Sequence, residues 1–301
     1  MKKAVIGLIM LTLLMFALTA CDSKDGGNDV SKQEATGNDN KDTANKEEAD
    51  QSEDNNQTDT SLEYVKNKGK LILGLDDSFP PMGFRDDAGN IVGFDIDLAE
   101  AVCKKLGVEL VVEPIKWIAK EHELNTKSID CIWNGFSVTP DRVEQLSMSI
   151  PYMENKLAIV VKNGSGIESK EDLAGKRLAV QGGSSAEEAL NTEENKEFRE
   201  SLGEINSSFK DYVTAVMDLE TGNSDAVLMD SVVATYMIHE VGKDFVILDD
   251  YLLAEEYAIG FRKGEEALVN AVNEALRELK ADQTVAEISE KWFGSDITII
   301  E

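Results

Sequence analysis

The sequence GFDIDLAEAVCKKLG, residues 93–107, predicts an amphipathic helix of an α/β module. Asp95 is placed to cap its amino end, because an aspartate side chain accepts hydrogen bonds from the free amides of a first helical turn. Apolar side chains repeat at helical spacing and form one stripe: Leu98, Val102 and Leu106. Gly107 supplies the left-handed conformation at which helices often stop. This pattern by itself fits the helix of any α/β domain.

Short apolar runs alternate with helical patterns through residues 61–301. The runs are Lys70–Leu75, Val108–Pro114, Ile129–Trp133, Leu157–Lys162, Arg177–Gln181, Asp225–Met229, Phe245–Leu248 and Ala258–Arg262. Such alternation predicts an α/β fold with mostly parallel sheets. The 241 residues concerned are more than one lobe usually holds and suit two. Ligands of such sheets bind at the carboxyl ends of the strands, so the residues after each run are the candidates for a site.

The segment 93–107 resembles the signature of the type 3 family of bacterial solute-binding proteins, and the tail supports the resemblance. Lys291-Trp292-Phe293-Gly294, after a helix expected at Ala267–Lys280, is similar to the ending of that family. The resemblance spans residues 64–297. It implies a two-lobe, type II periplasmic-binding-protein-like fold, with two crossings of the chain between lobes, near residues 153–155 and 253–256. It also implies a receptor that delivers a free amino acid to an ABC importer.

The first 60 residues indicate a targeting and tethering segment rather than part of the fold. Lys2 and Lys3, an apolar segment and then Leu18-Thr19-Ala20-Cys21 predict a signal peptide over residues 1–20 and a lipid anchor on Cys21. Residues 22–60 contain no aromatic, Leu or Ile side chain, so we expect residues 21–60 to be the lipidated cysteine and a disordered acidic tether. The resemblance then places the first lobe at 61–154 and 255–301 and the second lobe at 155–254.

Composition excludes several classes of partner. The chain has 30 basic and 58 acidic side chains, and its formal net charge of −28 repels phosphates, so we expect no nucleic-acid binding. Cys103 and Cys131 are expected to be buried free thiols, because a disulfide framework needs more cysteines. The only histidines are His122 and His239, and the standard catalytic, metal-binding and phosphate-loop motifs are missing. We therefore expect no cofactor, no metal and no enzymatic activity.

The loop after the run 70–75 provides two candidate ligand contacts, Asp76 and Phe79. Two prolines make this loop rigid rather than helical. The residues alone favour an Asx-turn at Asp76 and a core aromatic at Phe79. The resemblance instead implies that both face the side chain of a ligand. It also implies that Trp117, further along the chain, packs on the same side chain.

A second group of candidates follows the run 129–133. Thr139 as N-cap and Pro140 as the first helical residue predict a helix start. Arg142 then lies in the first turn, where the helix dipole disfavours a cation, so we expect it to have a partner. The resemblance implies that Arg142 clamps the α-carboxylate of an amino acid in a bidentate pair. It also implies backbone or hydroxyl contacts from Asn134, Gly135 and Ser137, although Asn134 and Gly135 depart from the small hydroxyl residues of some members.

The second lobe supplies further candidates at the ends of two runs. Ser184 and Glu187 fit a capping box after two glycines, so Ser184 is either a helix cap or a contact to an anion. The resemblance favours Ser184 and Ser185 as contacts to the ligand carboxylate, with Gln181 as a further side-chain contact. Asp230 is either a cap for a helix beginning at Ser231 or, as the resemblance implies, the acceptor of the α-ammonium group.

Arg142 and Asp230 would then be opposite poles, one from each lobe, and a zwitterion between them would neutralise both. A buried unpaired charge is costly, so we expect the cleft without ligand to stay open and the lobes to close on the ligand by a hinge motion. The aromatic pair Phe79 and Trp117, together with Asp76, favours arginine or lysine as the ligand, with glutamine and cystine as alternatives.

Two other classes of protein stay open at this point. One is an enzyme on the same fold, similar to cyclohexadienyl dehydratase, and the other is a sensory or adhesin lipoprotein. The main expectation is a monomeric binding protein, lipid-anchored on the extracytoplasmic face of the cell membrane. Its expected partners are a small-molecule amino acid and the transmembrane subunits of an ABC permease.

Overall fold

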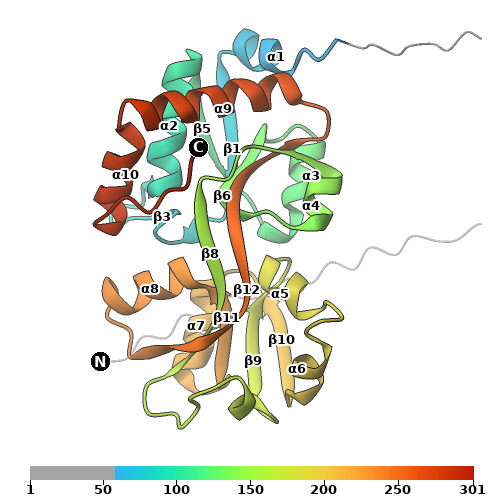
Figure 1. Cartoon of the computed structure of the whole chain (residues 1–301), viewed down its shortest axis with the longest axis vertical. Coiled ribbons are helices and arrows are strands. Elements are labelled where there is room, and N and C mark those ends of the chain that lie inside the picture. The colour runs from blue at the N-terminus through green and yellow to red at the C-terminus, as the bar shows by residue number, and fades with distance from the viewer. Residues whose placement is uncertain (1–57) are drawn as a thin grey trace, which may run out of the picture. The chain divides into compact units, whose positions relative to one another are not determined.

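A computed structural model describes residues 58–301, in which two lobes are joined by two long strands (Figure 1). The predicted signal peptide, Cys21 and the predicted tether up to residue 57 lie outside the described residues. Across residues 58–301, no helix combines the length and the apolar character that a membrane span requires.

The described chain contains helices of up to 16 residues, short strands and two strands of ten residues or more. The α-helices are α1 (Ser61–Lys68), α2 (Phe94–Leu106), α3 (Lys120–Asn125), α4 (Pro140–Gln145), α5 (Ser185–Leu190), α6 (Lys196–Ser201), α7 (Tyr212–Thr221), α8 (Ser231–His239), α9 (Glu266–Ala281) and α10 (Thr284–Phe293). The strands are β1 (Lys70–Leu75), β2 (Ser78–Phe79), β3 (Gly83–Arg85), β4 (Ile91–Val92), β5 (Glu109–Pro114), β6 (Cys131–Ser137), β7 (Leu146–Met148), β8 (Met153–Lys162), β9 (Arg177–Gln181), β10 (Glu204–Phe209), β11 (Ala226–Asp230) and β12 (Phe245–Arg262). Two 3₁₀ turns, η1 (Trp117–Ala119) and η2 (Glu171–Leu173), complete the set.

One mixed sheet runs through both lobes in the order β10-β9-β11-β8-β12-β6-β1-β5, with β7 paired to β12. The outer pairs are parallel, whereas the pairs that involve β8 and β12 are antiparallel. Figure 1 shows β8 and β12 passing from the lobe with α2 and α9 to the lobe with α7 and α8. We call these the first and the second lobe. The α/β fold class predicted from the sequence is confirmed, and the lobe boundaries predicted at 154/155 and 254/255 fall inside β8 and β12.

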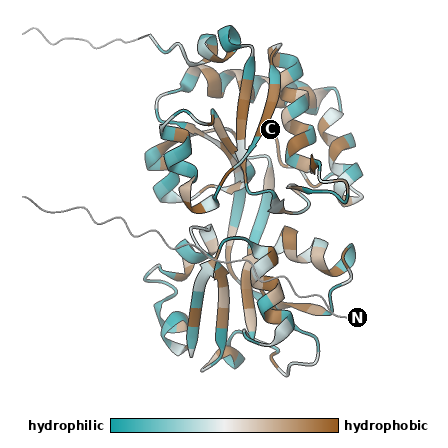
Figure 2. Ribbon diagram, turned by 180° about the vertical axis from the view of Figure 1, so that it is seen from behind, coloured by the Kyte–Doolittle hydropathy of each residue, from teal (hydrophilic) through white to brown (hydrophobic). Residues whose placement is uncertain are grey.

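Two predicted strands proved to be one. The runs 245–248 and 258–262 belong to β12, because the residues between them keep pairing with β8 through irregular register. The edge strand β10 was not among the predicted runs, since its sequence EINSSF is mostly polar. In Figure 2 the brown, hydrophobic segments of the sheet lie in strands inside the lobes, while the parts of β8 and β12 between the lobes are hydrophilic. Cys103 and Cys131 are buried and free, as predicted.

The helix predicted from residues 93–107 is α2, and its ends follow from local sequence. Gly107 has a φ of 73° and closes the helix, as predicted. At the other end the prediction was wrong, because the N-cap is Gly93 and not Asp95. Gly93 has a φ of 151°, and a Cβ atom there would lie 2.1 Å from the carbonyl oxygen of Met82, so this position requires glycine.

Asp95 instead acts at long range. Its side chain is fully buried, and Oδ2 accepts a hydrogen bond of 2.7 Å from the backbone amide of Gly135. Burial is the main cause that raises the pKa of Asp95 to about 7. The carboxyl group therefore joins α2 to β6, the strand that carries the predicted contacts Asn134, Gly135 and Ser137.

The raised pKa of Asp95 predicts a pH-dependent stability. A group whose folded-state pKa lies above its unfolded value contributes stability below that unfolded value, and this is lost as pH rises through the folded pKa. The wild-type free energy of unfolding, relative to that of D95N, should thus fall between pH 4 and pH 7 by up to about 1.4 kcal/mol per pH unit. Urea titrations across this range measure the difference. The exposed Glu100 on the same helix is the control: E100Q should keep the wild-type slope, and a D95N slope equal to it would contradict the prediction.

Candidate ligand site between the lobes

The carboxyl ends of β6, β9 and β11 and the loop after β1 meet at one small cavity between the lobes. It is lined by Phe79, Trp117, Gly135, Ser137, Arg142, Gln181, Ser184, Ser185, Tyr212 and Asp230. The structure thus brings together every predicted site residue except Asp76 and Asn134, which lie just behind the lining. The cavity measures about 10 Å³, close to the space of one water molecule, so the cleft is closed.

Arg142 lies in the first turn of α4, where the predicted helix start is confirmed. Thr139 Oγ1 accepts from the Arg142 amide at 3.4 Å, and Pro140 is the first helical residue. The guanidinium donates to the Ser137 carbonyl at 2.9 Å and pairs across the cleft with Glu188 of α5, also at 2.9 Å. Arg142 Nε is buried without a hydrogen-bond partner in the described chain, and Arg142 Cζ lies 4.3 Å from the centroid of the Phe136 ring. The partner that the sequence led us to expect for Arg142 is therefore present, and it is the carboxylate of Glu188 from the other lobe.

Asp230 ends β11 on the opposite side of the cavity. It precedes α8, but its carboxylate makes no capping hydrogen bond, so the helix-cap alternative is not what the structure shows. Oδ1 accepts instead from Asn155 Nδ2 at 2.7 Å and from the Tyr257 hydroxyl at 2.6 Å. Burial raises the pKa of Asp230, although the hydrogen bond from the Tyr257 hydroxyl and the charge of Arg142 oppose the shift.

Both poles of the cleft have protein partners, and this explains why the cleft is closed rather than open as expected. The expectation assumed that Arg142 and Asp230 would be buried without partners. Glu188, whose side chain is 39% exposed, neutralises the guanidinium from the rim, and two donors satisfy Asp230 from within. Arg142 and Asp230 therefore do not stand in the closed cleft without partners, which was the assumed obstacle to closure.

Asp76 and Gln181 form a second contact between the lobes. Gln181 Nε2 donates to Asp76 Oδ2 at 2.8 Å and to the Lys210 carbonyl at 2.9 Å. Asp76 Oδ1 accepts from the Ser78 amide at 3.0 Å, so the Asx-turn predicted from the residues is also present. Asn134 holds this loop, because its Oδ1 accepts from the Asp76 amide at 3.0 Å. Burial is the main cause that raises the pKa of Asp76 to about 6.

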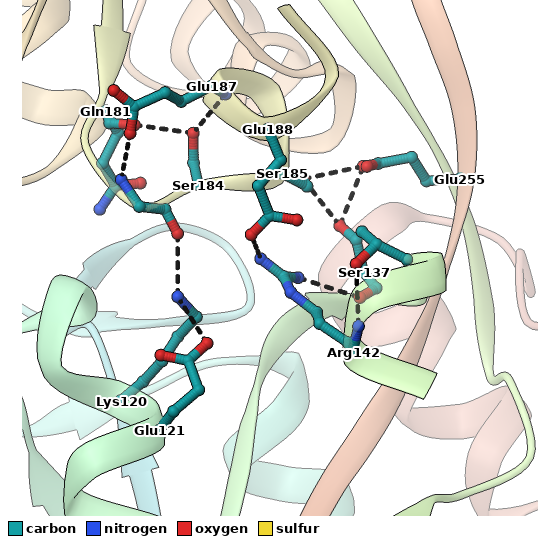
Figure 3. Close-up of polar contacts among 12 residues, drawn as sticks. Lys120, Glu121, Ser137, Arg142, Gln181, Ser184, Ser185, Glu187, Glu188 and Glu255 are labelled. Atoms are coloured by element: carbon teal, nitrogen blue, oxygen red, sulfur yellow. Dashed lines mark hydrogen bonds and ion pairs between the residues drawn. The ribbon is translucent and has the colours of Figure 1, made fainter. Parts of the chain in front are cut away.

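The second-lobe turn combines capping with contacts across the cleft (Figure 3). Ser184 Oγ accepts from the Glu187 amide at 3.2 Å, which confirms Ser184 as a helix cap. The Glu187 carboxylate accepts a hydrogen bond of 2.6 Å from the Gly183 amide. In a standard capping box it would accept from the amide of the cap residue itself, Ser184. Ser185 Oγ faces Ser137 Oγ of the first lobe at 3.1 Å.

Aromatic rings wall the cavity on two sides. Phe79 packs against Tyr212 with ring centroids 5.8 Å apart, and Trp117 meets Phe136 edge to face at 6.0 Å. Gly135 allows this packing, because its φ is 54° and a Cβ atom there would lie 2.7 Å from the Phe79 ring. Phe79 and Trp117 thus both line the cavity.

The residues of the cleft that were missed at the sequence level include Lys120, Glu188, Tyr212 and Glu255. Lys120 donates from the first lobe to the Gly183 carbonyl at 2.9 Å and lies 5.1 Å from the Trp117 ring. Burial lowers the pKa of Lys120, and burial with the charge of Asp230 raises that of Glu255 to about 7. Lys120 and Glu188 lie on short polar helices, and Tyr212 follows a strand that was not predicted. Only Glu255 had a signal, because it lies in the predicted crossing at 253–256.

Comparisons with known proteins point to one family. The profile of the bacterial extracellular solute-binding proteins, family 3, matches residues 71–295. The L-cystine-binding protein TcyJ of Escherichia coli (strain K12) is 32% identical over 240 residues, which cover 79% of this chain and 87% of that protein. The arginine-binding extracellular protein ArtP of Bacillus subtilis (strain 168) is 29% identical over 298 residues, covering 98% of this chain and all of that protein.

Solved structures support the same assignment. The crystal structure of an ABC uptake transporter substrate-binding protein from Streptococcus pneumoniae with bound histidine is similar, with a TM-score of 0.76 and 38% identity. The similarity covers 80% of this chain and 98% of that chain. It confirms the predicted two-lobe, periplasmic-binding-protein-like fold. By profile, sequence and structure, the chain belongs to family 3 of the bacterial extracellular solute-binding proteins.

Proposed function

We propose that this protein binds a free polar amino acid outside the cytoplasm, by closing its two lobes, and delivers it to the permease of an ABC importer. The observation that carries the proposal is that Arg142 and Asp230, of opposite charge and from opposite lobes, line one cavity. A guanidinium suits an α-carboxylate through two parallel hydrogen bonds, and a buried carboxylate suits an α-ammonium group. The relatives named above are described as binding cystine, arginine or histidine, which supports an amino acid as the ligand.

Binding requires the lobes to separate, because the closed cavity is far smaller than an amino acid. We infer that β8 and β12 act as the hinge and that the lobes are residues 61–154 with 255–301, and 155–254. On closure the ligand carboxylate would take the place of Glu188 at Arg142, supported by Ser137, Ser184 and Ser185. The ligand ammonium would donate to Asp230. Asn134 would act through the loop that it holds, and Gly135 through its backbone.

The side chain of the ligand would lie toward Asp76, between Phe79 and Trp117. Asp76 adjoins an open groove of about 460 Å³ that also contains Asp77 and Asp211. Asp77 pairs with Arg85 at 2.6 Å and Asp211 with Lys210 at 3.3 Å, whereas no ion pair to Asp76 occurs within residues 58–301. Asp76 is therefore the acid available to a cationic side chain. This favours arginine or lysine over the alternatives glutamine and cystine.

The Asp76→Asn variant should change which amino acid is preferred. The amide keeps the shape and removes the charge, so affinity for arginine should fall about tenfold or more while affinity for glutamine changes less. Isothermal titration calorimetry with L-arginine, L-lysine and L-glutamine measures this ranking. D77N is the matched control, since Asp77 already has Arg85 as its partner. An identical ranking in D76N and the wild type would contradict the role of Asp76.

A thermal-shift screen tests the proposed function itself. The probes are the twenty amino acids together with cystine and ornithine. A ligand at one hundred times its dissociation constant stabilises the folded protein by about 2.7 kcal/mol, which is an easily measured rise in Tm. If no probe raises the Tm, the proposed function is wrong. Conversion of a probe into a product would favour the enzyme alternative over a binding protein.

The remaining features of the proposal concern the membrane. We propose that the signal peptide is cleaved before Cys21, that Cys21 carries a lipid, and that the protein acts as a monomer on the extracytoplasmic face. Mass spectrometry of protein from the native host would show a lipid-modified Cys21 at the new amino end. A Cys21→Ser protein that still partitions with membranes would contradict the anchor. A membrane-bound sensory complex without transport would instead favour the sensory alternative.

A further inference from the structure

Glu255 is a buried acid that the proposed ligand contacts do not include. It lies in the part of β12 between the lobes and is 7% exposed. Glu255 pairs in register with Asn155 of β8, so both side chains lie on one face of the two connecting strands. The residues that alternate with them, Glu154, Lys156 and Glu256, are exposed on the other face. The connecting strands therefore turn a polar inner face toward the cleft.

One oxygen of this carboxylate collects hydrogen bonds from both lobes (Figure 3). Glu255 Oε2 accepts from Ser137 Oγ of the first lobe at 2.9 Å, and Ser185 Oγ of the second lobe lies 3.3 Å from the same oxygen. Asn155 Nδ2 donates to it at 3.1 Å and to Asp230 at 2.7 Å. The network therefore runs from the hydroxyl groups of both lobes to the proposed ammonium acceptor.

Burying the Glu255 carboxylate in this network costs free energy that a purely structural residue would not require. Glu255 Oε1 is buried and has no hydrogen-bond partner within residues 58–301. A neutral side chain of similar size would avoid the cost of burying that oxygen. Two serines from separate lobes meet at one oxygen only while the lobes are together. The hydrogen bonds of Glu255 to both serines thus belong to the closed arrangement.

We propose that Glu255 is a positioning residue that holds the cleft closed, by joining Ser137 to Ser185 and by orienting Asn155 against Asp230. The proposal rests on the proposed function, in which closure retains the ligand. It gives Glu255 no direct ligand contact, because Glu255 does not line the cavity. Removing the carboxylate should therefore shift the equilibrium between open and closed cleft before any ligand is added.

The test measures closure in the full chain by single-molecule energy transfer. Dyes are placed on cysteines introduced by E144C and E197C, at exposed positions on α4 of the first lobe and α6 of the second. Cys21 is replaced by serine, and Cys103 and Cys131 are buried. E255A should lower the equilibrium constant for closure about tenfold, the usual scale for a charge-assisted hydrogen bond. E255Q should restore part of the closed population, because its amide oxygen still accepts from the serines.

Two comparisons separate positioning from a general loss of structure. S185A should open the wild-type cleft but have little further effect in E255A, because the two residues share one hydrogen bond. The neighbouring E256Q removes an exposed acid and should leave closure unchanged. Wild-type distances in folded E255A and S185A, or an equal shift in E256Q, would overturn the proposal.

The same samples test amino-acid binding and the role of Glu255 separately. L-Arginine and L-cystine are added as probes only after the measurement without ligand. If neither probe nor any other amino acid of the screen changes the distances, the proposed function fails. The comparison without ligand still decides the role of Glu255.

Discussion

Replacing Arg142 with alanine is expected to weaken amino-acid binding by about 10² to 10⁴-fold, while the fold persists. Loss of one partner of a buried charged pair costs about 3 to 5 kcal/mol, which converts to this range of affinity. The ligand carboxylate would lose both hydrogen bonds of the guanidinium and stay buried opposite Phe136. Glu188, the present partner, can turn to water because its side chain is 39% exposed. Calorimetry with the tightest ligand of the thermal-shift screen measures the loss.

Two variants control for this prediction. R142K keeps the positive charge but not the planar fork, so its loss should be smaller than that of R142A. R177A removes an arginine at the start of β9, where it pairs with Asp225 at 2.9 Å away from the cavity, and affinity should stay at the wild-type value. Unchanged affinity in R142A would remove Arg142 from the site and leave the proposed clamp without a cation.

Replacing Asp230 with asparagine is expected to weaken binding by about a hundredfold or more. The variant keeps the size of the side chain but removes the charge that would face the α-ammonium group, and it sets an amide against the amide of Asn155. A buried ammonium without a counter-charge is strongly disfavoured. The loss should shrink for an analogue that lacks the α-amino group, because that analogue never made the interaction. Calorimetry with the amino acid and its deaminated analogue gives the comparison.

D225N is the matched control for D230N, because Asp225 lies next to the other end of β11 and pairs with Arg177. Its affinity should equal that of the wild type. If D230N lost the same factor for the amino acid and for the deaminated analogue, Asp230 would act on the cavity as a whole and not on the ammonium group.

Local sequence predicted the elements well where the determining contacts are local. The strands β1 and β9 begin and end where the apolar runs do, and Gly107 closes α2 through its own conformation. The capping turn at Ser184 was also predictable, since its partner Glu187 is three residues away. Asp95 was misassigned because its partner, the amide of Gly135, lies 40 residues further along the chain. Nothing near Asp95 in sequence reveals that partner.

Contacts between residues distant in sequence also limited the prediction of the candidate site. Its candidate residues were found because they follow strands and resemble a family pattern, and the cavity lining brings most of them together. Lys120, Glu188 and Tyr212 escaped notice, since a polar or aromatic residue on a short helix gives no sign of which lobe it will face. Glu255 lay within the expected crossing, but its contacts with Ser137 and Ser185 join three distant segments.

The sequence by itself determined the α/β class, most of the long strands, and the resemblance to a family of solute-binding proteins. Apolar periodicity, turn glycines and helix caps depend on interactions within a few residues, and they can therefore be recognised from the sequence alone. Only the tertiary structure decided that Arg142 pairs with Glu188, that Asp76 meets Gln181 across the cleft, and that Glu255 joins the two lobes. These are pairings of charges and hydrogen-bond donors between separate segments. The energies of these pairings depend on the burial of the groups and on the distances between them, and both are set by the folding and closure of the two lobes.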